Sequence, residues 1–215
     1  MTTHTAAAPV TKGRVLRSHA WAYDALVWFL TFGRERAFRE RLLDLARLAP
    51  GESVLDIGCG TGTLAIAAKG RVGDAGIVRG IDASPEMIAR ARKKAAKAGV
   101  DVVFETAVAE SLPFPERKFD VVLSTLMLHH LPRAVRAECA REVRRVLKPG
   151  GRILAVDFGR SGNERRGLIG HLHRHGHFTQ ERVAELLRDA GFTVAESGPV
   201  GRRDLHFTMG VVPGG

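Results

Sequence analysis

The stretch Val54-Leu55-Asp56-Ile57-Gly58-Cys59-Gly60-Thr61-Gly62 decides the fold, because it reads as a buried β-strand that runs straight into a glycine-rich turn. A helical pattern follows it. Glycine in such a turn lets the backbone bend sharply and approach a ligand closely at the carboxyl end of a strand, where open α/β sheets bind their ligands. The stretch therefore predicts a ligand site at a strand end of an α/β domain.

The residues around this turn argue against phosphate-bearing ligands. A P-loop needs Lys followed by Ser or Thr after its last glycine, whereas Thr63-Leu64 follows here. The dinucleotide pattern G-x-G-x-x-G fails because Thr63 stands where its third glycine belongs. Asp56 would repel a pyrophosphate but suits a ligand with a cationic end. S-adenosylmethionine, which carries an ammonium and a sulfonium and no phosphate, fits this pattern.

A second acid supports the same ligand. Asp82 closes the next expected strand in the stretch GIDAS (80–84), where a carboxylate can accept hydrogen bonds from both hydroxyls of a ribose. An alternative for Asp56 is a purely structural role in which its carboxylate binds the amides of the loop. Two acids at the ends of consecutive strands favour the ligand-binding interpretation.

Short β-rich runs alternate with helical patterns after residue 53, which predicts an α/β fold with crossover helices on both faces of a mostly parallel sheet. Strands are expected at 53–57, 77–81, 102–105, 119–124, 152–157, 192–196 and 205–211, and helices at 64–69, 85–98, 133–147 and 179–189. Thr179 is the expected N-cap of the last helix. The short connection between the last two strands predicts that they pair antiparallel.

The chain of 215 residues has the size of one α/β domain. Residues 1–13 are small and polar and predict a disordered tail. The remainder, 14–215, predicts a single domain whose segment 14–50 forms an N-terminal helical cap ending at a Pro-Gly pair. The cap is rich in aromatic residues, including Tyr23 and Trp28, which either pack it onto the core or roof an apolar substrate pocket.

Residues from about 50 to 160 resemble the class I S-adenosylmethionine-dependent methyltransferases, in the branch that acts on small molecules. The motifs VLDIGCGTG (54–62), the acid of GIDAS (80–84), ESLPFPERKFDVV (110–122), LMLHHLP (126–132) and VLKPGG (146–151) carry the resemblance. It implies a Rossmann-like, doubly wound, seven-stranded sheet with a reversed last strand. It also implies methyl transfer from S-adenosylmethionine, with S-adenosylhomocysteine as product.

The resemblance assigns cofactor-binding residues position by position. They are Asp56, Gly58, Cys59 and Gly60 at the methionine end, Asp82 at the ribose, Ala83 and Met87 beside the adenine, Val108 and Ala109 in the loop that binds the adenine amine, and Thr125 at the end of the fourth strand. Val108 replaces the acid that the family has there, which removes one hydrogen-bond acceptor worth about 1 kcal/mol. Backbone atoms around Ala109 are expected to compensate.

Two histidines follow the fourth strand, near the expected position of the methyl group. If the acceptor is protonated at neutral pH, His129 is the candidate catalytic base, because the pKa of histidine lies near neutrality. His130, Tyr23 and Trp28 are the candidate substrate-binding residues. The alternative is that the histidine pair orders the loop that enters the helix at Pro132.

The acceptor class follows from resemblance as well. VLKPGGRILAVDF (146–158) resembles the quinone C-methyltransferases of ubiquinone and menaquinone synthesis, although that branch has an Arg-Asn pair in place of His129-His130. We expect a small, fairly apolar acceptor, methylated on oxygen, nitrogen or carbon of a quinol, phenol or amine. The alternatives are N-methylation of a phospholipid headgroup and cofactor binding without methyl transfer. Thr63 and Asp56 disfavour a nicotinamide dehydrogenase.

Charge and composition limit which partners and which cellular compartment we expect. The net charge of +10 comes from basic residues spread over helix faces without interleaved aromatics, which argues against nucleic acid and is compatible with contact to a membrane surface. The longest uncharged apolar run, 25–32, is too short to span a bilayer, and no signal peptide is evident, so we expect a cytoplasmic protein. Cys59 and Cys139 are expected to be free thiols.

A run of alternating histidines remains, at His171, His173, His175 and His177. As a strand it would place all four on one face. Arg174 lies among them and no carboxylate or cysteine is interleaved, so we predict a polar loop over the acceptor pocket and no metal site.

Overall fold

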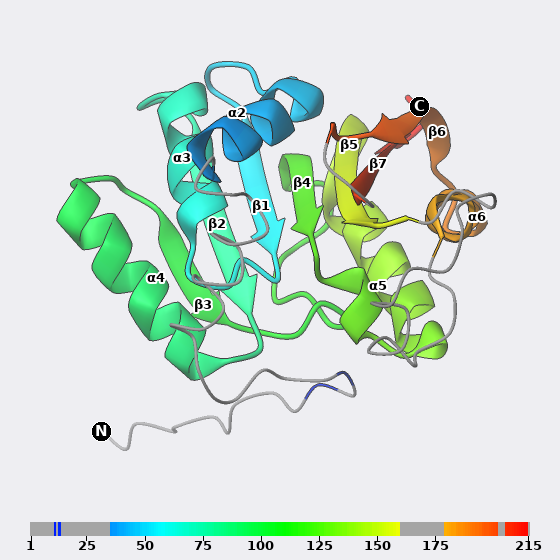
Figure 1. The fold of residues 1–215 in the computed structure, drawn as a ribbon, viewed down its shortest axis with the longest axis horizontal. Coiled ribbons are helices and arrows are strands. Elements are labelled where there is room, and N and C mark those ends of the chain that lie inside the picture. The colour runs from blue at the N-terminus through cyan, green and yellow to red at the C-terminus, as the bar shows by residue number, and fades with distance from the viewer. Residues whose placement is uncertain (1–10, 12, 14–34, 160–178, 202–204, 215) are drawn as a thin grey trace.

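The chain forms a seven-stranded sheet in the order β3-β2-β1-β4-β5-β7-β6 (Figure 1). The computed structural model describes residues 11, 13, 35–159, 179–201 and 205–214. The strands are β1 (Ser53–Ile57), β2 (Ile77–Asp82), β3 (Val103–Thr106), β4 (Phe119–Thr125), β5 (Leu147–Phe158), β6 (Thr193–Pro199) and β7 (Leu205–Val211). Only β7 runs against its neighbours, pairing antiparallel with both β5 and β6. The expected fold with a reversed last strand is confirmed.

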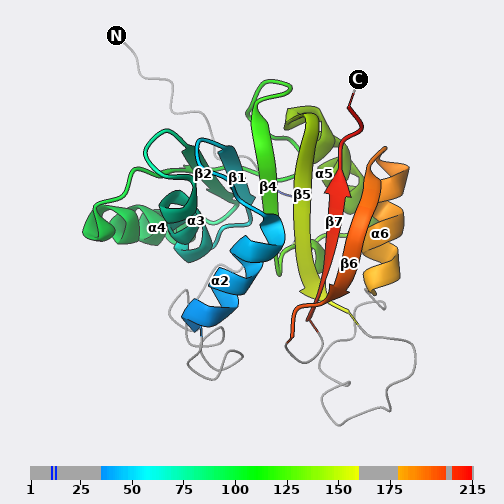
Figure 2. The same cartoon turned by 90° about the horizontal axis from the view of Figure 1, so that it is seen from above.

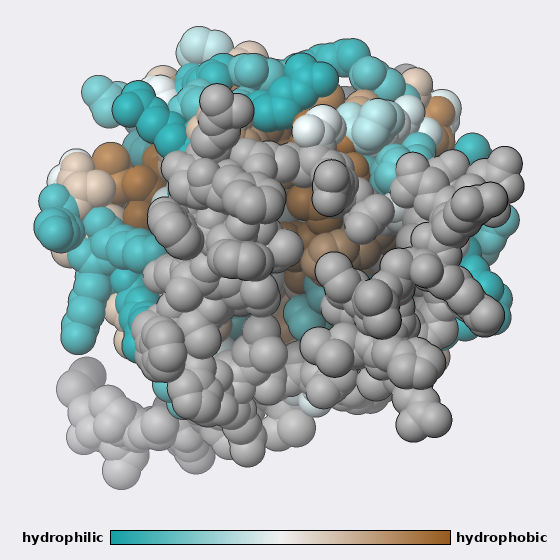
Figure 3. Space-filling model, viewed as in Figure 1, coloured by the Kyte–Doolittle hydropathy of each residue, from teal (hydrophilic) through white to brown (hydrophobic). Residues whose placement is uncertain are grey.

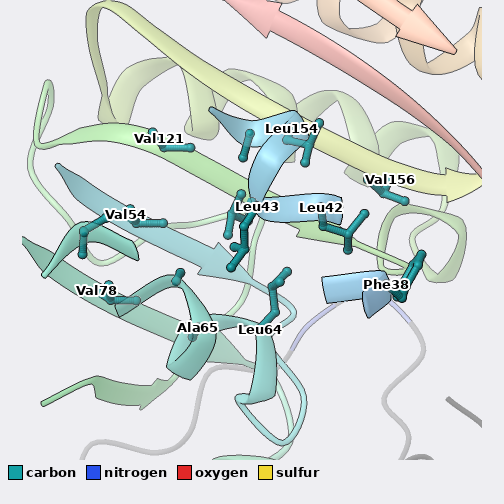
Figure 4. Close-up of a cluster of buried hydrophobic side chains, with 14 of the residues drawn as sticks. Phe38, Leu42, Leu43, Val54, Leu64, Ala65, Val78, Val121, Leu154 and Val156 are labelled. Atoms are coloured by element: carbon teal, nitrogen blue, oxygen red, sulfur yellow. The ribbon is translucent and has the colours of Figure 1, made fainter. Parts of the chain in front are cut away.

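Helices cover both faces of this sheet (Figure 2). They are α2 (Glu35–Ala46), α3 (Thr63–Val72), α4 (Pro85–Ala98), α5 (Arg133–Val146) and α6 (Gln180–Asp189), with a short 3₁₀-helix η1 at Leu128–His130. Side chains alternate across a strand, so Val54 packs with α2, α3 and α4 while its neighbour Leu55 packs with α5 and α6. Figure 4 shows the first of these two cores, where Leu42 and Leu43 of α2 lie near strand residues such as Val54.

Local capping explains why two helices begin where the sequence predicts. The Ser84 hydroxyl accepts the Met87 N–H at 3.3 Å, and Pro85 occupies the first turn of α4, whose expected bounds are confirmed. The Thr179 hydroxyl accepts the Arg182 N–H at 3.4 Å and caps α6 as predicted. Each cap satisfies an amide that the helix itself leaves without a partner.

The first described helix ends earlier than the sequence predicts. The Pro50-Gly51 pair was the expected end, but α2 stops at Ala46 because Arg47 adopts a left-handed conformation with φ 52°. The Arg152 guanidinium on β5 donates to the Ala46 and Arg47 carbonyls at 2.7 and 2.6 Å. A long-range contact therefore caps this helix, which the local pattern could not reveal.

Other boundaries differ by a few residues. Helix α3 runs from Thr63 to Val72 and is longer than the expected range 64–69. Strand β5 begins at Leu147 and not at the expected residue 152, because Leu147 pairs with Phe119 of β4 ahead of an irregularity in the strand pairing. The 3₁₀-helix at 128–130 was not expected.

Several predictions lie outside the described residues. They are the cap segment 14–34 with Tyr23 and Trp28, and the histidines His171, His173, His175 and His177. Of the expected tail 1–13, the structure describes Thr11 and Gly13. Both cysteines are free thiols, as predicted. Among the helices that the structure describes, none is long and apolar enough to cross a membrane.

Candidate active site

A cavity opens at the carboxyl ends of β1, β2 and β4, the edge at which ligands bind in α/β sheets. Seven of the predicted site residues line it: Gly58, Gly60, Asp82, Ala83, Met87, Ala109 and His130. Five others, Asp56, Cys59, Val108, Thr125 and His129, do not. The structure therefore brings together the residues of the glycine turn, the end of β2 and the loop after β3.

The glycine turn is held in a shape that needs glycine. Gly58, Gly60 and Gly62 have φ values of 67°, 54° and 76°, which other residues rarely adopt. A Cβ on Gly58 would lie 2.4 Å from Cγ of Met127, so the turn also packs directly against the segment that follows β4. The Cys59 N–H donates to the Ile81 carbonyl at 2.9 Å and joins the turn to β2.

Asp82 presents a carboxylate to this cavity. Its Oδ2 accepts the Gly60 N–H at 3.0 Å and its Oδ1 accepts the Ser84 N–H at 2.9 Å. Each oxygen keeps a second lone pair, so the group can still accept two donors from a ligand. Burial raises the pKa of Asp82 from its ordinary value, and the two amide hydrogen bonds oppose that shift.

The described lining of the cavity contains two carboxylates, Asp82 and Glu110, and no lysine or arginine. This charge distribution suits a cationic ligand and disfavours a phosphate. The remaining surface includes small and apolar side chains such as Ala83, Met87 and Ala109, which can contact a flat ring.

Asp56 is placed differently from Asp82. It is 2% exposed, points to the α3 side of the sheet and accepts the backbone N–H of Ala65 in the first turn of that helix. Its Oδ2 is buried with no hydrogen-bond partner among the described residues. Burial, followed by repulsion from Asp82, raises the pKa of Asp56 to about 8. Through the hydrogen bond to Ala65, the carboxyl holds the start of α3.

Three other predicted cofactor residues, Cys59, Val108 and Thr125, are not part of the cavity lining. Burial, with the charges of Asp56 and Asp82, raises the pKa of the Cys59 thiol well above its ordinary value, so it is a neutral group. Val108 is buried and pairs with Ser111 in a short bridge. The Thr125 hydroxyl oxygen is buried without a hydrogen-bond partner in the described part of the chain.

The segment after β4 turns sharply into the cavity. Leu126 has a left-handed φ of 55°, and its N–H donates to the Val156 carbonyl at 2.8 Å. A non-glycine residue in this region costs on the order of 1–2 kcal/mol, and such residues concentrate at functional sites. The turn brings Met127 and His130 to the cavity wall.

His129 is fixed by Asp157 at the end of β5. The carboxylate Oδ1 lies 2.7 Å from His129 Nδ1, and Oδ2 accepts the His129 backbone N–H at 3.1 Å. Asp157 is 2% exposed, whereas the His129 side chain is 19% exposed. The imidazole also contacts the ring of Phe158, at 5.1 Å between centroids, and that of His130, at 3.9 Å. A carboxylate on Nδ1 selects the tautomer that carries its proton there and leaves Nε2 as the acceptor.

Nine residues that line the cavity were not among the predicted site residues: Thr11, Gly13, Ile81, Ser84, Ala107, Glu110, Leu126, Met127 and Leu131. Leu126, Met127 and Leu131 belong to the LMLHHLP motif, so the position of that motif after the fourth strand was an available signal. Thr11 and Gly13 gave none, because they are brought to the cavity by a contact across the whole fold.

Comparisons with known proteins show similarity to methyltransferases. Residues 54–151 match the family model described as "Methyltransferase domain". The demethylmenaquinone methyltransferase of Thermus thermophilus is 40% identical over 136 residues, which cover 63% of this chain and 60% of that protein. The 27-O-demethylrifamycin SV methyltransferase of Amycolatopsis mediterranei is 44% identical over 123 residues, which cover 55% of this chain and 43% of that protein.

The fold is shared with solved structures. An S-adenosylmethionine-dependent methyltransferase from Aquifex aeolicus superposes with a TM-score of 0.73 over 91% of this chain and 100% of that chain, at 22% identity. The chain aligns with about 60% or less of the length of the two curated relatives named above. In sequence this chain is therefore similar to methyltransferases, and it shares the fold of a solved S-adenosylmethionine-dependent methyltransferase.

Proposed function

We propose that the cavity binds S-adenosylmethionine and that the chain transfers its methyl group to a small, fairly apolar acceptor. The observation that carries this proposal is Asp82, whose carboxylate is oriented by two loop amides at the wall of a cavity without a lining cation among the described residues. Gly58 and Gly60, which lack side chains, leave the cavity wall next to Asp82 open to a ligand. Both features fit a cationic nucleoside.

The chain's own residues would divide the work by position. Asp82 accepts the ribose hydroxyls, Gly58 and Gly60 flank the methionine part, and Ala83, Met87 and Ala109 contact the adenine. S-adenosylmethionine supplies an activated methyl group, so the protein mainly has to align the acceptor and exclude water.

His129 is the proposed base for an acceptor that carries a proton. As the acceptor's electron pair forms its bond to the methyl carbon, the carbon–sulfur bond breaks and its electron pair stays on sulfur, which leaves S-adenosylhomocysteine. The acceptor's proton passes to Nε2 of His129, and Asp157 stabilises the imidazolium that results. Because His129 is outside the cavity lining, the acceptor is proposed to approach from the side of η1 and the end of β5.

The acceptor class rests on two further observations. Hydrophobic surface, drawn in brown, is visible in the middle of the face in Figure 3, and hydrophilic surface lies above it. One relative's name specifies a quinone acceptor, and the other's specifies an oxygen atom. We therefore propose an acceptor of the quinol or phenol type that is methylated on oxygen or carbon.

Calorimetric titration with S-adenosylhomocysteine tests the cofactor assignment. The variant Asp82→Asn should bind about 10- to 100-fold more weakly, since a hydrogen bond to a charged group contributes roughly 1.5–3 kcal/mol. Asp101→Asn, at an exposed carboxyl outside the cavity, is the matched control and should bind like the wild type. Absence of binding by the wild type, or equal affinity of Asp82→Asn and Asp101→Asn, would remove the basis of the assignment.

Turnover is measured separately, with S-adenosylmethionine labelled in its methyl group and a panel of quinols, phenols and amines. Transfer of label to a quinol or phenol would support the acceptor class. Binding of S-adenosylhomocysteine without transfer to any of these acceptors would instead favour a cofactor-binding protein without methyltransferase activity.

A further inference from the structure

Two residues that precede every described helix lie against the cofactor cavity. Thr11 and Gly13 form part of its lining, although the sequence gives their segment no motif. The Thr11 hydroxyl donates to Glu110 Oε1 at 2.7 Å, across 99 residues of sequence. These two residues therefore contribute to the wall of the cavity.

The hydroxyl of Thr11 has a second role. It accepts the Gly13 N–H at 3.0 Å, so the same oxygen is hydrogen-bonded both to Gly13 and to Glu110. Glu110 belongs to the loop after β3, and its carboxylate lies at the cavity wall near the predicted adenine residue Ala109. A short hydroxyl-to-carboxylate hydrogen bond of this kind is among the stronger ones in proteins.

Gly13 lies against the other side of the cavity. A Cβ at this position would come within 2.7 Å of Leu131 Cδ2 and 3.6 Å of the His130 carbonyl oxygen. The backbone therefore approaches η1 as closely as glycine allows. Thr11 therefore contacts the loop after β3 and Gly13 contacts the residues after β4, and both of these regions line the cavity.

We propose that Thr11 and Gly13 close the cavity over the bound cofactor and that Glu110 is the residue that holds them there. This inference rests on the proposed function, because the ligand that is enclosed is S-adenosylmethionine or its product. Breaking the Thr11–Glu110 hydrogen bond would free this part of the wall and so speed the release of a ligand. Glu110 and Thr11 are thus positioning residues that act on the residence time of the cofactor.

The test uses the full chain and S-adenosylhomocysteine, with affinity from calorimetry and dissociation rate from stopped-flow displacement. Thr11→Val keeps the shape of the side chain and removes its hydroxyl. It should raise Kd about 3- to 30-fold, mainly through faster dissociation, as expected for loss of one hydrogen bond to a charged group. Thr193→Val, at an exposed position on the edge strand β6, is the matched control and should leave both quantities unchanged.

A double-mutant cycle with Glu110→Leu distinguishes the effect of losing the Thr11–Glu110 hydrogen bond from a general loss of packing around Thr11. If Glu110 acts through Thr11, then Thr11→Val should have no further effect on dissociation in the Glu110→Leu background. Additive effects, or a Thr11→Val variant that matches Thr193→Val, would overturn the inference while leaving the proposed function intact. A wild-type protein that does not bind S-adenosylhomocysteine would overturn both. Thermal melts without ligand should be the same for Thr11→Val and the wild type, because the hydrogen bond lies outside both hydrophobic cores.

Discussion

The two halves of the site fix their polar groups in different ways. At the ends of β1 and β2, the carboxylate of Asp82 is oriented by backbone amides of the glycine turn and of its own loop. At the ends of β4 and β5, His129 is oriented by a side chain, Asp157, which lies 28 residues away. The first half depends on backbone conformation and the second on a pair of side chains. Substitutions in the first half should therefore lower stability by straining the backbone. Substitutions in the second half should lower the rate of methyl transfer by removing a group that accepts a proton.

Two buried carboxyl groups, those of Asp157 and Asp56, differ in how fully their oxygens are hydrogen-bonded. Asp157 receives three hydrogen bonds, from the ring and backbone of His129 and from the Phe158 N–H at 2.8 Å. Asp56 is equally buried, yet one of its oxygens has no partner in the described part of the chain and its pKa is raised to about 8. A carboxyl with this pKa is mostly protonated at neutral pH, because that form avoids the cost of burying a charge.

The largest effect is expected in the second half of the site. His129→Asn and Asp157→Ala should each lower kcat by about 10²- to 10⁴-fold for an acceptor that is protonated at the assay pH, since a general base contributes roughly that much. For a phenol that is already ionised, His129→Asn should have little effect. The affinity for S-adenosylhomocysteine should stay close to that of the wild type.

The measurement is the rate of methyl transfer across phenols of graded acidity. A loss that is equal for ionised and protonated acceptors would show that His129 orders the loop and does not remove a proton. That outcome would make the two halves alike, each dependent on shape alone.

In the glycine turn, we expect a substitution to act mainly by lowering the free energy of unfolding through steric and backbone strain. A Cβ on Gly62 would lie 2.5 Å from Phe104 Cζ and 2.8 Å from Ala91 Cβ, both buried, and the residue has a φ of 76°. Gly62→Ala should therefore lower the free energy of unfolding by about 3 kcal/mol, from overpacking together with the left-handed backbone.

Urea denaturation of Gly62→Ala is compared with that of Gly70→Ala. Gly70 lies within α3, and nothing would touch its Cβ. This control should gain about 0.5–1 kcal/mol, because alanine is the better helix former. If Gly62→Ala were as stable as the control, the turn would be adaptable, and the contrast with the His129–Asp157 pair would be lost.

The smallest effect is expected from Asp56, and it depends on pH. The pKa of Asp56 is about 8 in the folded protein, above the value of about 3.9 in an unfolded chain. Between these values the folded state binds the extra proton, so the free energy of unfolding falls as pH rises, by at most about 1.4 kcal/mol per unit. Asp56→Asn removes this group, so the wild type should lose about 2 kcal/mol relative to the variant between pH 5.5 and 7.5.

Urea denaturation of both proteins across this range measures the difference. Parallel pH profiles would mean that Asp56 is ionised in the folded state, for instance because water reaches Oδ2. A charged Asp56 would bring it closer to the ligand-binding role that the sequence suggests.

The sequence determined the fold and the first half of the site, because the relevant signals are local. Alternating strand and helix patterns, the capping residues Ser84 and Thr179, and the contiguous stretch 54–62 are all set by neighbours in the chain. The expected order of motifs was enough to place Gly58, Gly60 and Asp82 at one edge of the sheet.

Only the tertiary structure decided which polar groups meet. It paired His129 with Asp157, joined Thr11 to Glu110 and placed the Arg152 guanidinium on the end of α2. It also gave Asp56 and Asp82 different surroundings, although the two acids look equivalent in sequence: Asp56 is bonded to the Ala65 N–H of α3, whereas Asp82 lines the cavity. Hydrogen bonds and burial between distant segments have no local signature, since they depend on the path of the chain through space.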